Sequence, residues 1–163
     1  MPTPVFRQLT RREVNVTVDW AAAEGWNPGL HDAEAFWAAD PEAFIGMDLD
    51  GDLIGCLSLA CYDQTADRKR GFMGFFIVKP EHRGQGLGTR LWRYGRELHR
   101  ARLGPAAPIS MDGVFDMQPW YAKDGATFTH RNLRVAGTGQ ATTEADHPRL
   151  HPLTALPFAT VQA

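Results

Sequence analysis

A glycine-rich turn between an apolar segment and a helical pattern constrains this chain more than any other feature. Phe72–Val78 is a continuous apolar run, typical of a strand buried on both faces, and it ends at Lys79–Pro80. From Thr89 to Leu103 apolar residues recur at helical spacing, continuing back to Leu87. The turn between the two segments carries glycines at positions 84, 86 and 88.

This placement predicts an anion site at the start of the helix. Backbone N–H groups at a helix N-terminus lack partners within the helix, and glycines let a pyrophosphate approach them closely. A glycine turn can also serve only as a tight start to a helix, so the residues alone leave both interpretations open. A P-loop is excluded because no Lys-Ser or Lys-Thr pair follows the second glycine. A dinucleotide-binding fold is disfavoured because its glycines should begin directly at the strand end. Here the glycine spacing differs and Lys79–Arg83 intervene.

The N-terminal third predicts a strand and two helices. Val5–Leu9 is a strand candidate, and Thr10 with Glu13 forms a capping box that begins a helix. This helix would bury Val14, Val18 and Ala21. After the break at Gly25–Gly29, Asp32 is expected to cap a second helix that carries Phe36 and Trp37 into the core and ends at Asp40–Pro41.

The rest of the chain predicts mainly strands. Ala43–Leu49 and Leu53–Tyr62 are apolar runs joined by Asp50-Gly51, which favours antiparallel pairing through a hairpin. The segments that follow are expected to be a charged loop over Asp63–Arg70, a helix stop at Gly104-Pro105, a strand over Ile109–Val114, a short helix around Tyr121, a turn at Asp124-Gly125 and a strand over Thr127–Val135. The predicted order is β-α-α-β-β-β-α-β-α-β. We expect an α/β fold of the α+β type, a mostly antiparallel twisted sheet flanked by helices.

Bulk properties narrow the function classes. With 163 residues, the chain suits one domain, residues 1–136, followed by a proline-rich arm or linker over 137–163. A net charge of -2 gives no basic field, and an acidic residue interrupts the arginines of the 89–103 helix, so we expect no nucleic-acid partner. No apolar run reaches membrane-spanning length, and two cysteines in one apolar run indicate a reducing, cytoplasmic location. His147 and His151 lack further ligands, so no metal is expected.

Arg83-Gly84-Gln85-Gly86-Leu87-Gly88, preceded by Val78-Lys79-Pro80, resembles the acyl-CoA signature of the GNAT acetyltransferase superfamily. The resemblance implies a GNAT fold over roughly Val5–Val135, with acetyl-CoA as cosubstrate between the fourth and fifth strands. It also implies that Gly84–Thr89 donate backbone N–H groups to the pyrophosphate and that Phe76–Val78 pair with the pantetheine arm. The expected cofactor-binding residues are Phe76, Ile77, Val78, Arg83, Gly84, Gln85, Gly86, Leu87, Gly88 and Thr89.

The segment Trp120–Ala126 resembles the family's Tyr-x-x-x-Gly-aromatic pattern, which implies that Tyr121 is the general acid that protonates the leaving thiolate. Ala126 departs from the common aromatic, and Gln118 is the nearest amide to the Asn that many members carry. On composition alone, a packed core tyrosine is the alternative. Asp112 is the candidate general base, with a turn role at Asp112-Gly113 or a water relay as alternatives.

The segment between the first two helices mixes aromatic and polar residues and is the candidate acceptor site, with Glu24, Trp26, Asn27 and His31 as substrate-binding residues. A helix end with a packed tryptophan is the alternative. The expected function is direct acetyl transfer to a primary amine of a small molecule or protein. The second hypothesis is a non-catalytic acyl-CoA binding module. The arm would dock on its own domain, on a second subunit of a homodimer, or lead into a second domain of a longer protein.

Overall fold

The computed structural model describes residues 3–62, 69–133, 135–139, 151 and 153–157. The chain divides into two units, Met1–Phe128 and Thr129–Ala163. The described part of the second unit holds one short 3₁₀ helix, Leu153–Ala155. Every other helix and strand below belongs to the first unit.

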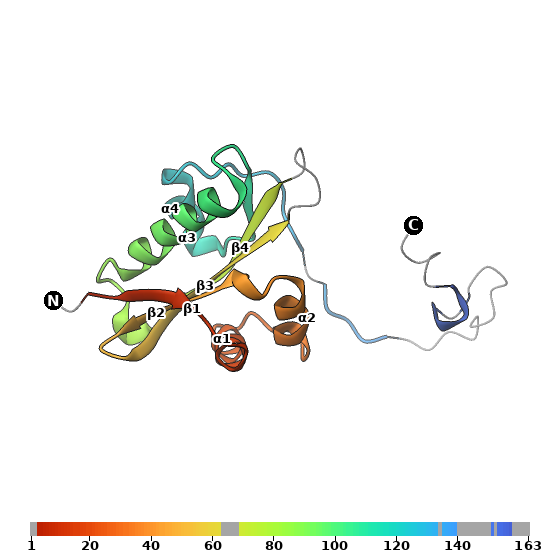
Figure 1. Ribbon diagram of the computed structural model, residues 1–163. Helices are drawn as coiled ribbons and strands as arrows, with labels where there is room; N and C mark the ends of the chain where they lie inside the picture. The colour runs from red at the N-terminus through yellow and green to blue at the C-terminus, as the bar shows by residue number, and fades with distance from the viewer. Residues whose placement is uncertain (1–2, 63–68, 134, 140–150, 152, 158–163) are drawn as a thin grey trace. The chain divides into compact units, whose positions relative to one another are not determined.

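The first unit is built on a five-stranded sheet in the order β1-β2-β3-β4-β5 (Figure 1). The strands are β1 Val5–Gln8, β2 Phe44–Leu49, β3 Asp52–Tyr62, β4 Arg70–Val78 and β5 Ile109–Met111. Neighbours along the chain are antiparallel from β1 to β4, whereas β4 and β5 are parallel. The predicted mostly antiparallel sheet is therefore confirmed.

Four α-helices cover the two faces of this sheet. They are α1 Arg11–Ala23, α2 Asp32–Ala39, α3 Leu87–Leu103 and α4 Gln118–Lys123, with 3₁₀ turns at Pro41–Ala43, Pro80–His82 and Phe115–Met117. In Figure 1, α1 and α2 lie on one side of the strands and α3 and α4 on the other. One buried cluster packs Leu57, Leu59 and Leu91 on the α3 side, and a second packs Val14, Phe44 and Ile77 on the α1 side. The sheet thus separates two apolar layers.

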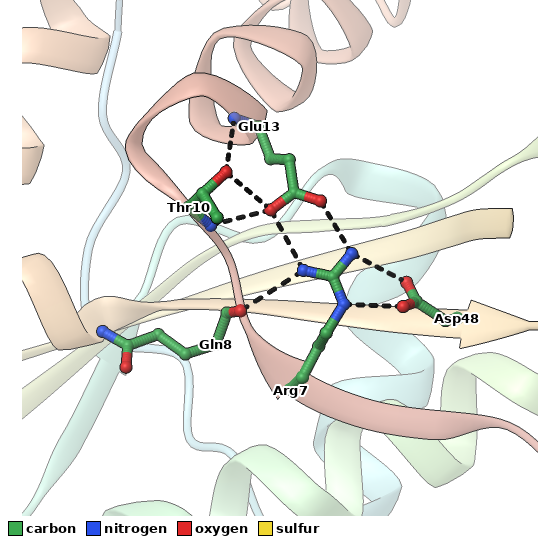
Figure 2. Close-up of polar contacts among 5 residues, drawn as sticks. All are labelled: Arg7, Gln8, Thr10, Glu13 and Asp48. Carbon is green, nitrogen blue, oxygen red and sulfur yellow. Dashed lines mark hydrogen bonds and ion pairs between the residues drawn. The ribbon is translucent and has the colours of Figure 1, made fainter. Parts of the chain in front are cut away.

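The start of α1 follows the predicted capping box (Figure 2). The hydroxyl of Thr10 accepts from the Glu13 backbone N–H at 3.3 Å, and the Glu13 carboxylate accepts from the Thr10 N–H at 2.8 Å. Arg7 of β1 donates both to Glu13 at 2.7 Å and to Asp48 of β2 at 2.6 Å. The hydrogen bond from Arg7 is the largest cause that lowers the pKa of Glu13 to about 2. One guanidinium therefore ties β1, β2 and the first turn of α1 together.

The predicted hairpin between the second and third strands is confirmed. Asp50 and Gly51 have φ angles of 53° and 92°, which matches a turn with two left-handed residues. The antiparallel register pairs Leu49 with Asp52 on either side of it.

β4 contains a bulge that the sequence analysis did not predict. Cys56 pairs with Ile77 and Ser58 pairs with Gly74. Between these two pairs β3 advances by two residues and β4 by three, so β4 holds one extra residue. Phe75 takes up the extra residue with a φ of 47°, in the left-handed region that non-glycine residues rarely occupy.

The bulge changes which side chains of β4 share a face. Met73, Phe76 and Val78 pack in the cluster on the α3 side, while Phe75 and Ile77 pack in the cluster on the α1 side. In an unbroken strand, residues 73, 75 and 77 would lie on one face. The bulge therefore sends Phe76 and Val78 to the layer of α3 and Phe75 to the layer of α1.

Two predicted strands need correction. No strand exists over the described part of Thr127–Val135, because its apolar residues cannot form one face: Phe128 would point opposite to Leu133 and Val135. All three are strongly exposed. The predicted strand Ile109–Val114 ends at Met111, since Gly113 packs against the ring of Tyr121 instead of continuing the sheet.

Details of the first two helices also differ from prediction. Thr17, not Val18, completes the buried stripe of α1. Asp32 does not cap α2 by its side chain; its carboxylate accepts from the Gly29 N–H at 2.8 Å. Phe36 is 47% exposed and so does not enter the core, although Trp37 packs against the core cluster on the α1 side.

Cys56 and Cys61 do not form a disulfide, as predicted, and Cys56 is buried. None of the helices in the described part of the chain is long and apolar enough to cross a membrane. Most of the predicted charged loop over Asp63–Arg70 lies outside the described residues, as does His147.

Candidate functional site

A cleft opens where β4 continues beyond the end of β5. β5 pairs only with Gly71, Phe72 and Met73, whereas β4 runs on to Val78. The cavity measures about 360 Å³. Its lining is Glu24, Trp26, Met73, Gly74, Phe75, Phe76, Ile77, Val78, Arg83, Gly84, Gly88, Trp92, Met111, Asp112, Val114, Met117 and Tyr121. It is therefore built from β4, the glycine turn, α3, the region around α4 and the loop after α1.

The glycine turn, the candidate anion cradle, contributes Gly84 and Gly88 to the lining of this cleft. Gly84 and Gly86 have φ angles of 75° and 76°, and a Cβ at either position would point into open space. Gly86 is the N-cap of α3, and its carbonyl accepts the bond from the Arg90 N–H. The N–H groups ahead of Arg90 in the first turn have no carbonyl within the helix to bond, so they can bind an anion.

The predicted cofactor-binding residues are partly gathered in the lining. Phe76, Ile77, Val78, Arg83, Gly84 and Gly88 line the cleft. Gln85, Gly86, Leu87 and Thr89 belong to the same turn and helix start but not to the lining. Leu87 is buried in the core, and the Gln85 amide donates to the Glu81 carbonyl at 3.4 Å.

Arg83 links the glycine turn to the loop after α1. Its Nε donates to the Val78 carbonyl at 2.7 Å, and its terminal NH2 group forms an ion pair with Glu24. The guanidinium therefore bonds to two acceptors of the chain itself. Lys79 contacts α1 itself, with its ammonium 5.3 Å from the centre of the Trp20 ring.

Tyr121 is held at the cleft by an aromatic cluster. Its ring lies 5.2 Å from that of Trp92 and 5.5 Å from that of Trp120, and Trp120 stacks on Phe76 at 6.0 Å. Asp124 fixes the end of α4 by accepting from the Trp92 indole N–H at 2.6 Å. These contacts position Tyr121 against α3 and beside Gly113, just after the end of β5.

The protonation states near α4 follow from these contacts. Burial raises the pKa of Tyr121 above its ordinary value of 10, so the phenol keeps its proton at neutral pH and can donate. The hydrogen bond from Trp92, followed by that from Arg96, lowers the pKa of Asp124.

Asp112 shares the cleft with Tyr121. It follows the last residue of β5, and the next residue, Gly113, packs so closely that an added Cβ would lie 3.0 Å from the Tyr121 ring. The predicted acid and the predicted base therefore line the same cavity.

The candidate acceptor residues separate into two pairs. Glu24 and Trp26 line the cleft, whereas Asn27 and His31 do not. Asn27 has a left-handed φ of 50° in the loop, and His31 is the exposed N-cap residue of α2.

The sequence analysis missed part of the lining. The residues it did not single out are Met73, Gly74, Phe75, Trp92, Met111, Val114 and Met117. Gly74 was the available signal, because a glycine inside an apolar strand often marks a bulge. Among the residues that the structure describes, no three His, Cys, Asp or Glu side chains lie close enough to hold a metal ion.

Solved structures place this arrangement in the class of GNAT acetyltransferase folds. An acetyltransferase of Trypanosoma brucei matches with a TM-score of 0.61 and 20% identity, over 82% of this chain and 99% of its own. A protein of Clostridium acetobutylicum described as a predicted acetyltransferase, solved with acetyl-CoA, matches with a TM-score of 0.64 and 15% identity, over 82% of this chain and 96% of its own. At such identities the likeness shows the fold.

A family model then gives the family. The model of the acetyltransferase (GNAT) family matches residues 11–126, and this chain belongs to that family of enzymes. The holothin acyltransferase of a Pseudoalteromonas strain is 29% identical over 126 residues, 77% of this chain and 40% of that protein. An uncharacterised protein of Caenorhabditis elegans is 26% identical over 69% of this chain and 36% of its own length. The chain thus spans about two fifths of the length of these relatives.

Proposed function

We propose that this chain binds acetyl-CoA in the cleft beside β4 and transfers the acetyl group directly to a primary amine. The observation that carries the proposal is that the glycine turn, the part of β4 unpaired by β5 and Tyr121 all line one cavity. Acetyl-CoA bound to the Clostridium protein of the same fold supports this cosubstrate. The name of the Pseudoalteromonas relative, a holothin acyltransferase, supports acyl transfer.

The residues divide the chemistry among them. The first N–H groups of α3 and the glycine turn hold the pyrophosphate, and the backbone of Phe76–Val78 bonds the pantetheine arm. The amine nitrogen attacks the thioester carbonyl carbon, and a backbone N–H of β4 stabilises the oxygen that gains charge. As the C–S bond breaks, Tyr121 gives its proton to the thiolate and regains one from solvent. Asp112, directly or through water, takes the proton lost by the amine.

Turnover tests this proposal against a module that only binds acyl-CoA. Purified protein is mixed with acetyl-CoA and a panel of primary amines, and free thiol is followed with a disulfide dye. Thiol release that requires both amine and protein is the expected result. Tight binding of acetyl-CoA by calorimetry with no thiol release from any amine would favour the binding module.

The cofactor cradle has its own test. Replacing Gly86 with Glu places a carboxylate and a strained backbone where the pyrophosphate would bind, so acetyl-CoA binding should be lost. Gly104→Glu is the matched control: Gly104 also has a positive φ and open space for a Cβ, but it lies at the other end of the 17-residue α3, ~25 Å away. If both variants bind acetyl-CoA equally well, the cradle is assigned wrongly.

We also propose that the protein works in the cytoplasm. Neither cysteine forms a disulfide, and Cys56 is buried in the core as a thiol, as expected where thiols stay reduced.

A further inference from the structure

The cleft has two differently built halves, separated by β4. Phe76 and Val78 face the layer of α3 beside the glycine turn. Phe75 faces the opposite layer, where Trp26 from the loop after α1 also packs. Both Phe75 and Trp26 line the cavity. On the α1 side of β4 the lining therefore carries a wall of aromatic rings.

An exposed ring extends this wall. Phe36 of α2 meets Phe75 edge to face, with ring centres 6.4 Å apart, yet Phe36 is 47% exposed. Phe75 in turn meets Phe44 of the core at 6.0 Å, so the lining ring is anchored. An aromatic surface that is packed on one side and open to solvent on the other binds a flat apolar group favourably, because the contact buries apolar area.

The charges of the cleft exclude one kind of acceptor. The charged side chains in the lining are Glu24, Arg83 and Asp112. Arg83 is the one cation among these lining residues, and it donates to Glu24 and to the Val78 carbonyl. Together these three side chains carry one more negative charge than positive, so a carboxylate or phosphate on the acceptor would be repelled. A protonated amine would be attracted by the same net charge.

We infer that the acceptor is a small amine with a flat aromatic body and no carboxylate or phosphate. This inference rests on the acetyl transfer proposed above and names its substrate class. The aromatic body packs against Trp26 and Phe75, with Phe36 closing over its outer edge. The acids draw the ammonium group toward the thioester, where it must lose its proton before attack.

Matched amines test the inference by thiol release at saturating acetyl-CoA. 2-Phenylethylamine has the ring and no acid, phenylalanine adds a carboxylate to the same body, and n-butylamine lacks the ring. We expect kcat/KM for 2-phenylethylamine to exceed that for each of the others at least tenfold. Calorimetry with CoA bound should likewise detect 2-phenylethylamine and not phenylalanine. A preference for phenylalanine, glutamate, n-butylamine or a lysine peptide would overturn the inference.

Two variants locate the recognition. Phe36→Ala should raise the KM for 2-phenylethylamine about fivefold and leave that for n-butylamine unchanged, whereas Phe128→Ala, which removes another exposed ring outside the lining, should change neither. Val114→Arg places a cation in the lining and should raise the relative rate with phenylalanine at least fivefold. Equal effects of Phe36→Ala on both amines would contradict the aromatic wall.

The outcomes separate this inference from the proposed transfer. Thiol release with other amines but not with 2-phenylethylamine leaves acetyl transfer standing and overturns the acceptor class. Bound acetyl-CoA without thiol release from any amine overturns both.

Discussion

Tyr121 is the residue on which the proposed chemistry depends most directly. Burial raises its pKa, so the phenol remains a proton donor across the neutral and mildly alkaline range. Tyr121→Phe keeps the ring contacts to Trp92 and Trp120 and removes only the hydroxyl. We expect kcat to fall about 100-fold, with the KM for acetyl-CoA nearly unchanged, in the thiol-release assay.

Tyr94 offers the matched control for that substitution. It is a half-buried tyrosine of α3 that stacks on Phe6 at 4.7 Å and lies outside the cleft lining. Tyr94→Phe should leave kcat within about twofold of the parent. A Tyr121→Phe variant as active as Tyr94→Phe would show that the thiolate leaves without this acid.

Arg83 is the residue whose position in the structure differs most from what its place in the motif suggests. Its side chain bonds the Val78 carbonyl and the Glu24 carboxylate, so it holds the glycine turn against β4 and the loop after α1. Arg83→Met should raise the KM for acetyl-CoA about tenfold because the cradle loses its anchor. Stability should change by less than about 1 kcal/mol, because the ion pair is exposed. Substrate-dependence kinetics and urea unfolding measure the two effects.

The control for Arg83 is Arg100→Met, which removes an exposed arginine near the other end of α3. Its KM for acetyl-CoA should match the parent. If Arg83→Met also matches the parent, the side chain has no part in shaping the cradle.

At the scale of elements, prediction succeeded where local chemistry decides. The capping box at Thr10, the Asp50-Gly51 hairpin and the stop at Gly104 each form as expected because the residues that determine them are neighbours in sequence. The strand over Thr127–Val135 failed because a strand needs a consistent face, and the apolar residues there alternate out of phase.

The same distinction applies to the candidate site. The glycine turn could be located from the sequence because the strand, the turn and the helix follow each other along the chain. The bulge at Phe75 depends on how β4 pairs with β3, and the Arg83–Glu24 ion pair joins residues 59 positions apart. Apart from Gly74, whose place inside an apolar strand hints at the bulge, local sequence indicates neither feature. The aromatic wall and the contacts of Arg83 were therefore found only in the folded structure.

The capping box gives the prediction at this scale. Thr10→Ala removes the hydroxyl that accepts from the Glu13 N–H, which should lower the free energy of unfolding by about 1 kcal/mol. Thr127→Ala, at an exposed residue outside helix and strand, should lower it by less than about 0.5 kcal/mol. Urea unfolding monitored by circular dichroism compares the two, and equal losses would mean that the cap contributes nothing.

The pH dependence of the stability of the whole domain should arise largely from one buried histidine. His99 of α3 is 2% exposed, and its Nε2 has no hydrogen-bond partner among the residues that the structure describes. Burial is the largest cause that lowers its pKa below 6.5; the nearby charges of Arg96 and Arg100 add to this, and a hydrogen bond with the Pro108 carbonyl opposes it. The folded protein therefore keeps His99 neutral at pH values where the unfolded chain binds a proton.

The sign of the pH dependence follows from that difference. Well above pH 6.5 neither state binds a proton at His99, and its contribution to stability is fully present. As the pH falls below 6.5, the unfolded state binds a proton at His99 that the folded state does not bind. The free energy of unfolding therefore drops by up to about 1.4 kcal/mol per pH unit. Glu13 adds a separate loss only at lower pH, between its ordinary value of 4.5 and about 2.

Urea unfolding between pH 7.5 and pH 5 isolates the histidine from the carboxylate. His99→Asn keeps a side-chain amide near the Pro108 carbonyl but cannot bind the proton, so its free energy of unfolding should fall less steeply over this range than that of the parent. His130→Asn removes an exposed histidine of the second unit and should keep the parental slope. Parallel slopes for the parent and His99→Asn would place the acid sensitivity elsewhere, whereas a flatter slope for His99→Asn alone would trace it to the imidazole packed between α3 and β4 beside Gly71.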